Sequence, residues 1–131
     1  MSRHTPRRKR VDRAFARGRR QRAHGFLEAA RAIAATDHAD ANACVSNAVL
    51  AGIAAGDAIC AAALGEISVS QHHGDAADLL ASVDRDLGRR LTTLVGLKSQ
   101  SQYGASLIGA ANLRIALRCA EALVAAATER V

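Results

Sequence analysis

Proline is almost missing from this chain, and this limits its fold more than any other feature. A single proline, Pro6, occurs in 131 residues, and proline ends helices more strongly than any other residue. No run of β-branched residues alternates with polar ones, so no segment shows the pattern of a half-buried strand. Half of the residues are apolar, enough for one core built from Ala, Leu, Val and Ile. The sequence predicts a soluble, single-domain, all-α protein, an up-and-down bundle of four to five helices.

Apolar residues that recur every three or four positions indicate where these helices lie. Gly65 offers a left-handed stop at the end of the second helix, and Gly52 and Gly56 within that helix predict close packing against a neighbour. A polar loop, residues 98–104, is expected between the last two helices. The expected helices run from between Arg8 and Arg20 to Ala35, from the Asp40 region to about Leu64, from about Asp75 to Val83, from near Asp84 to the residues before Lys98, and from about Ala105 to Glu129.

Positive charge is concentrated at the N-terminus. Residues 1–22 hold ten Arg or Lys against one acid, a net +9, whereas the other 109 residues hold eight basic and eleven acidic groups, a net −3. Repulsion among the cations predicts a disordered or frayed arm over residues 1–22, followed by a bundle domain over residues 23–131. Such arms bind phosphates, acidic proteins or anionic membranes, or only increase solubility. The candidate phosphate-binding residues are Arg7, Arg8, Lys9, Arg10, Arg13, Arg17, Arg19, Arg20 and Arg22, with Lys98 in the polar loop.

Cysteine usage and hydropathy indicate a cytoplasmic protein. Cys44, Cys60 and Cys119 are an odd number in apolar stretches, as expected for buried thiols in a reducing compartment. Residues 43–65 are the one candidate membrane span, but Asn47 and Asp57 interrupt them, which favours a buried helix. No ligand spacing indicates a metal site, so we expect no metal, no cofactor and no membrane partner.

Candidate chemistry gathers at the polar loop, residues 98–104. It contains the only Tyr of the chain. If the loop has no functional role, the ring of this Tyr covers part of the core. Lys98 and Gln102 are expected beside a helix N-terminus, where an anion is favoured. The two adjacent histidines of the preceding connector would approach Lys98 if that connector folds over it, and are otherwise surface groups. The candidate catalytic residues are Lys98, Gln102, Tyr103, His72 and His73.

Four features together resemble the HEPN superfamily over about residues 20–130. They are Phe-Leu-Glu-Ala-Ala-Arg at 26–31, the small-residue helix 42–64, the connector that ends in His72-His73, and above all Lys98-x-x-x-Gln102-Tyr103-Gly104. The last is similar to a bacterial subgroup whose motif more often reads K-x-x-x-H-Y-G. The resemblance implies a helical bundle, commonly a homodimer. Many members are metal-independent RNases or toxins in which an R-x(4–6)-H motif from each subunit performs acid–base chemistry on RNA.

The departure from this pattern at Gln102 shapes the functional hypotheses. A glutamine amide cannot shuttle a proton near neutral pH, so we expect a non-catalytic or weakly active dimer. It would bind the phosphate backbone of RNA or DNA through its arm and Lys98. Two apolar faces on the last helix, one with Ile115 and one with Leu117, favour a homodimer.

Two alternatives are kept. One is an RNase or toxin in which Lys98, Tyr103 and a histidine of the 72–73 pair rebuild a working site, with an antitoxin as its protein partner. The other is a protein-interaction subunit of a larger assembly, whose arm docks an acidic protein.

Overall fold

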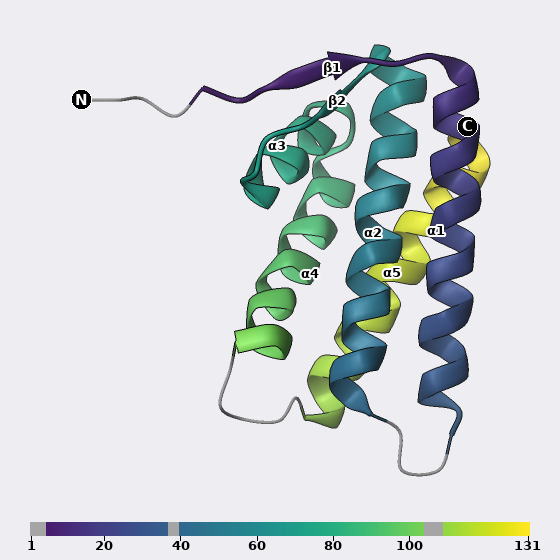
Figure 1. The fold of residues 1–131 in the computed structure, drawn as a ribbon, viewed down its shortest axis with the longest axis vertical. Helices are drawn as coiled ribbons and strands as arrows, with labels where there is room; N and C mark the ends of the chain where they lie inside the picture. Colours follow the sequence, from purple (N-terminus) through teal and green to yellow (C-terminus); the bar gives the residue numbers. More distant parts are fainter. Residues whose placement is uncertain (1–4, 37–39, 104–108) are drawn as a thin grey trace.

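The computed structural model describes residues 5–36, 40–103 and 109–131, with the side chains of residues 99–103 left out. Five helices pack together, and a pair of short strands crosses one end of them (Figure 1). The four long helices alternate in direction along the chain. The elements are β1 (Arg8–Arg10), α1 (Arg13–Ala34), α2 (Ala41–Leu64), β2 (Glu66–Ser68), α3 (His73–Val83), α4 (Arg85–Tyr103) and α5 (Ala110–Arg130).

Helix α2 is the centre of the core. It packs against each of the other four helices, and its buried face consists mainly of Ala, Gly and Cys. Its length and composition would suffice to cross a membrane, but 61% of its most apolar stretch is buried inside the bundle. Its central place in the core accounts for this apolarity. The prediction of buried thiols is confirmed, because Cys44, Cys60 and Cys119 are all buried and free.

Local capping explains where α1 and α2 begin and end. The Asp12 carboxylate accepts the amide of Phe15 at 2.9 Å, and the Asp40 carboxylate accepts that of Ala43 at 3.1 Å. Both satisfy amides that lack a partner within the helix. Gly65 adopts a left-handed conformation with φ of 69° and ends α2, as its sequence position predicts.

The prediction of a purely helical chain is wrong at one place. β1 and β2 pair antiparallel with Lys9 opposite Ile67, and an ion pair of 3.2 Å joins Arg8 to Glu66 across them. Each strand has only three residues, too few to produce an alternating pattern in the sequence. The fold is therefore mostly helical, with a small two-stranded sheet.

The first 22 residues also differ from the expected disordered or frayed arm. Residues 8–10 form β1 and α1 already begins at Arg13, so the bundle includes residues that we expected to precede it. Val11 and Phe15 pack against a small cluster of Ala16, Ala61 and Ile67. These apolar contacts, together with acidic partners from α2 and β2, offset the repulsion among the cations.

The sequence predicts that the fourth helix ends before a polar loop at residues 98–104, and the structure differs from this. α4 continues to Tyr103, and α5 begins at Ala110, so Lys98 lies within a helix. Lys and Gln are good helix formers although they are polar, and the first helix-breaking residue of the segment is Gly104. Residues 104–108 lie outside the described part of the chain.

Two glycines allow close helix packing. A Cβ atom at Gly52 would overlap the Cδ1 atom of buried Leu94, which confirms the close approach predicted there. Gly88 of α4 was not anticipated: a Cβ atom there would lie 2.7 Å from Cα and 2.9 Å from the amide nitrogen of Ala81 in α3.

Replacing Gly88 with alanine tests this contact, because backbone atoms cannot move aside as a side-chain end can. We expect Gly88→Ala to lower the free energy of unfolding by about 1–3 kcal/mol, despite the better helix propensity of alanine. Gly96→Ala is the matched control on the same helix, since a Cβ atom there meets nothing within 4 Å, and it should raise stability by up to about 1 kcal/mol. Urea denaturation measures both, and equal effects would contradict the contact.

Candidate nucleic-acid interface

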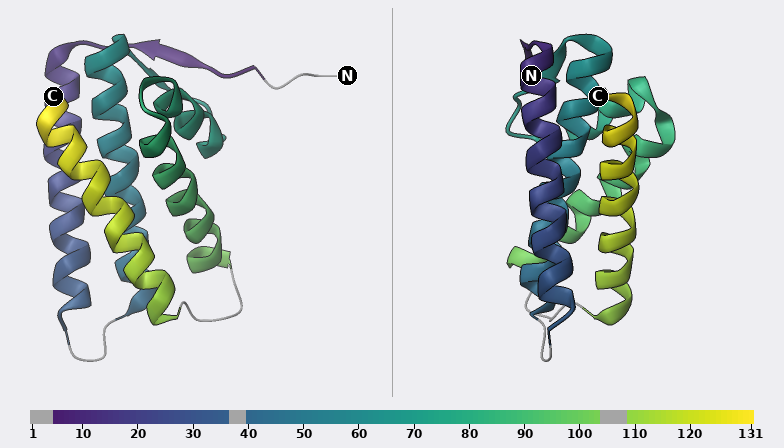
Figure 2. Two further views of the ribbon diagram at one scale, coloured as in Figure 1. Left: turned by 180° about the vertical axis from the view of Figure 1, so that it is seen from behind. Right: turned by 90° about the vertical axis from the view of Figure 1, so that its right-hand side faces the viewer.

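One flank of α1 carries a row of basic side chains. Arg13, Arg17, Arg20 and His24 are separated by four, three and four positions, which places them on the same side of a helix. This flank faces the end of α5, which lies beside the first turns of α1 (Figure 2). Two contacts join the helices there. Arg20 Nη1 donates to the carbonyl of Val131 at 2.6 Å, and His24 Nε2 lies 2.8 Å from Oγ1 of Thr128.

Between these helices the surface is hollowed into what we call the α1–α5 groove. Near β1 it deepens into a pocket of about 280 Å³, lined by Arg13, Ala16, Arg17, Ala62, Arg130 and Val131. Further along α1 it continues as a shallow hollow, lined by Ala14, Arg17, Gly18, Arg20, Gln21, His24 and Thr128. Arg17 lines both parts, and no Asp, Glu, Phe, Tyr or Trp side chain lines either.

β1 carries further cations, none of which lines the α1–α5 groove. Residues 7–10 are exposed, and the strand runs outward from the top of the bundle. Among the residues that the structure describes, five of the predicted phosphate-binding cations have no ion pair, side-chain hydrogen bond or ring contact. These are Arg7, Lys9, Arg10, Arg13 and Arg17.

Two other predicted phosphate contacts lie away from the groove. Arg19 Nη2 is 3.2 Å from Oδ2 of Asp57, and only 28% and 16% of these side chains are exposed. Burial raises the pKa of Asp57 to about 6, although Arg19 acts in the opposite direction. Arg22 lies over the ring of Phe26, 4.9 Å from its centroid. Its spacing from Arg13 places it on the opposite side of α1.

Lys98 forms a separate site with a histidine. Lys98 Nζ lies 3.1 Å from Nε2 of His73, the first residue of α3. Burial, and then the charge of Lys98, lower the pKa of His73. Lys98 is therefore beside the N-terminus of α3. It is not among the residues that line the α1–α5 groove.

The remaining catalytic candidates are not brought to Lys98 by any described contact. The backbone amide of His72 donates to Oγ of Ser70 at 3.2 Å, and His72 lines another hollow beside Arg7. Gln102 and Tyr103 are in the last turn of α4, and their side chains lie outside the described residues.

The sequence analysis missed two residues of the groove. His24 could have been found from its spacing, because it continues the row of Arg13, Arg17 and Arg20 along α1. Arg130 is more than a hundred positions from these residues, and no sequence pattern indicates that α5 returns alongside α1.

Neither a metal site nor a known relative assigns a further role to the described residues. Within residues 5–36, 40–103 and 109–131, no group of three His, Cys, Asp or Glu side chains is placed to hold a metal ion. No protein-family model matches this chain, and no curated protein matches it. The resemblance to the HEPN superfamily stays a prediction.

The partly buried Arg19–Asp57 ion pair predicts a pH dependence of stability. Because the pKa of Asp57 is raised from 3.8 to about 6 in the folded protein, the folded state binds this proton more tightly than the unfolded state does. The contribution of Asp57 to stability therefore falls as the pH rises from 3.8 to about 6. An NMR titration of the Asp57 carboxyl should give a midpoint near 6. In Arg19→Gln the midpoint should be higher, because the neighbouring cation is gone. A midpoint near 4 in the unmodified protein would contradict the burial of this pair.

Proposed function

We propose that this protein binds the phosphate backbone of nucleic acids through the α1–α5 groove and the cations of β1. The observation that carries the proposal is the lining of the groove, where basic side chains from α1 and α5 meet without an acidic side chain. Arg13 and Arg17, which have no ion-pair partner among the described residues, suit phosphate oxygens, because the guanidinium group donates two parallel hydrogen bonds.

The length of the basic row suits a strand of nucleic acid. From Arg13 to His24 the helix advances eleven residues, about 16 Å at 1.5 Å per residue. One strand of a duplex carries a phosphate about every 3.4 Å along its axis, so the row can follow about five phosphates. No Phe, Tyr or Trp side chain lines the groove, which favours binding without strong base specificity.

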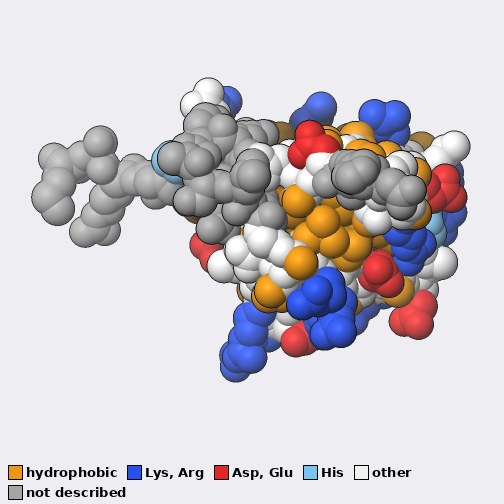
Figure 3. All heavy atoms as spheres, turned by 90° about the horizontal axis from the view of Figure 1, so that it is seen from below, with side chains coloured by type: hydrophobic (Ala, Val, Ile, Leu, Met, Phe, Trp, Pro, Cys, Tyr) orange, Lys and Arg blue, Asp and Glu red, His pale blue; other side chains and the backbone are white. Residues whose placement is uncertain are grey.

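The HEPN relationship and a homodimer remain part of this proposal. The Lys98 motif lies at the end of α4 and before the last helix of a five-helix fold, in keeping with the resemblance. Leu50 and Ile115 are 41% and 43% exposed, and hydrophobic side chains also reach the surface at the lower end of the bundle (Figure 3). A second copy would cover such surface.

A second candidate function, RNA cleavage, is favoured by the Lys98–His73 contact. A histidine kept neutral beside a cation can accept a proton, and the lysine can hold a phosphate. If this site is active, Lys98→Ala and His73→Asn each abolish cleavage of single-stranded RNA while leaving the thermal midpoint unchanged. We place RNA cleavage second because Lys98 does not line the groove in which the basic side chains gather.

Salt dependence tests the proposed function. Affinity for a fluorescent oligonucleotide should fall steeply between 50 and 200 mM salt, because bound phosphates release counterions. In the double variant Arg13→Gln/Arg17→Gln, the slope of log affinity against log salt should fall by about 1.4–1.8, which corresponds to two lost contacts. Arg22→Gln removes one charge from the opposite side of α1 and should leave the slope nearly unchanged.

The control and the cleavage readout make the result decisive. If the double variant and Arg22→Gln behave alike, the groove is not the binding surface. If affinity does not depend on salt, backbone binding is excluded, and an acidic protein partner of the arm becomes the better hypothesis. Loss of intact RNA in the same samples would favour the Lys98–His73 candidate.

A further inference from the structure

The pocket near β1 differs from the rest of the groove in how many cations surround one small space. Arg13 and Arg17 enter it from α1 and Arg130 from α5, above a floor that includes Ala16 and Ala62. Its volume of about 280 Å³ is close to the lower end of the range for small-molecule sites. Three guanidinium groups thus border a space with room for a phosphate group and part of a nucleoside.

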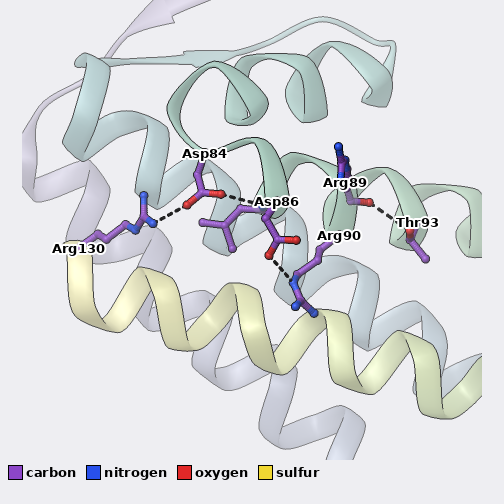
Figure 4. Close-up of polar contacts among 7 residues, drawn as sticks. Asp84, Asp86, Arg89, Arg90, Thr93 and Arg130 are labelled. Atoms are coloured by element: carbon purple, nitrogen blue, oxygen red, sulfur yellow. Dashed lines mark hydrogen bonds and ion pairs between the residues drawn. The ribbon is translucent and has the colours of Figure 1, made fainter.

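Arg130 is held in place from outside the pocket. Its Nη2 lies 2.6 Å from Oδ2 of Asp84, at the junction of α3 and α4 (Figure 4). Asp84 is itself fixed, because its Oδ1 accepts the amide of Leu87 at 3.1 Å. A guanidinium group has five N–H donors, so the contact with Asp84 orients Arg130 and leaves donors for a ligand.

The two arginines of α1 stand where their charge is unfavourable for folding. Arg13 is the first residue of α1, where a cation opposes the helix dipole. The capping carboxylate of Asp12 precedes it, but the first turn itself holds no acid. Arg17 follows four positions later, so the like charges also repel one another. An anion between them would remove both costs. Departures from local stability rules of this kind are expected at functional sites.

The charge of the pocket selects the class of ligand, because Arg13 and Arg17 have no ion-pair partner among the described residues whereas Arg130 is paired with Asp84. A phosphodiester within a strand carries a single negative charge, whereas a phosphate monoester carries about −1.5 to −2 near neutral pH and offers three terminal oxygens. We propose that this pocket is a site for a terminal phosphate monoester. The ligand is either the phosphorylated end of a nucleic-acid strand or a free nucleotide. Binding of a strand end rests on the proposed nucleic-acid function, whereas binding of a free nucleotide does not.

The experiment compares ends of otherwise identical ligands. Eight-nucleotide single strands with a 5′-phosphate, a 3′-phosphate or only hydroxyl ends are titrated at pH 7.5 and constant salt, and adenosine 5′-monophosphate is titrated separately. We expect one phosphorylated end to raise affinity by about tenfold, equivalent to about 1.4 kcal/mol. This preference should shrink below about pH 6, where the monoester takes up its second proton.

Variants connect the preference to the pocket. Arg130→Gln should lower the ratio between phosphorylated and hydroxyl-ended strands to about one, whatever its effect on the affinity for hydroxyl-ended strands. Arg17→Gln repeats the test if Arg130→Gln loses its contact with Asp84 and unfolds, as circular dichroism would reveal. Arg22→Gln should keep the ratio of the unmodified protein.

The outcomes separate this inference from the proposed function. Salt-sensitive binding of hydroxyl-ended strands, with no gain from either phosphate, overturns the pocket assignment and leaves backbone binding intact. Binding of adenosine 5′-monophosphate that depends on Arg130, without binding of any strand, supports the pocket and overturns the nucleic-acid function. A preference that persists in both Arg130→Gln and Arg17→Gln overturns the assignment to this pocket.

Discussion

Close packing around α2 is the constraint on which the rest of this structure depends. The helix buries a surface of Ala, Gly and Cys side chains, and large side chains from its neighbours, such as Leu94 and Leu123, fill the space at Gly52. Because α1 and α5 both lie against α2, they also meet each other. The end of α5 thereby reaches the beginning of α1, and Arg130 joins cations that are more than a hundred positions away in the chain. The α1–α5 groove is a consequence of how the core is built.

The structure divides the N-terminal cations into two sets with different physical roles. Arg8 and Arg19 are paired with Glu66 and Asp57 and attach the start of the chain to β2 and α2. Exposed pairs such as Arg8–Glu66 contribute little each, so the apolar contacts of Phe15 are needed as well. The second set, in β1 and along the groove, has no acidic partner among the residues that the structure describes. Pairing thus accounts for part of the N-terminal charge and leaves Arg13 and Arg17 as unpaired cations in the groove.

Sequence reasoning anticipated what depends on local patterns. The end of α1, the bounds of α2, the left-handed stop at Gly65 and the buried cysteines follow from periodicity and capping chemistry. The sequence pattern does not indicate β1 and β2, which are too short, nor that α4 continues through the polar residues 98–103. Much of the candidate site depends on contacts between distant segments. The pairing of Arg19 with Asp57, the place of Arg130 and the contact of Lys98 with His73 come from packing that no single stretch of sequence records.

The central claim is that nucleic acid binds along the α1–α5 groove, and NMR mapping on the intact protein tests it most directly. Amide and arginine side-chain signals would be followed during titration with a hydroxyl-ended single-stranded oligonucleotide. The account predicts saturable shifts at Arg13, Arg17, Arg20 and His24, with Lys98 and His73 nearly unchanged. Shifts confined to Lys98 and His73, or no saturable shift along α1, would contradict it.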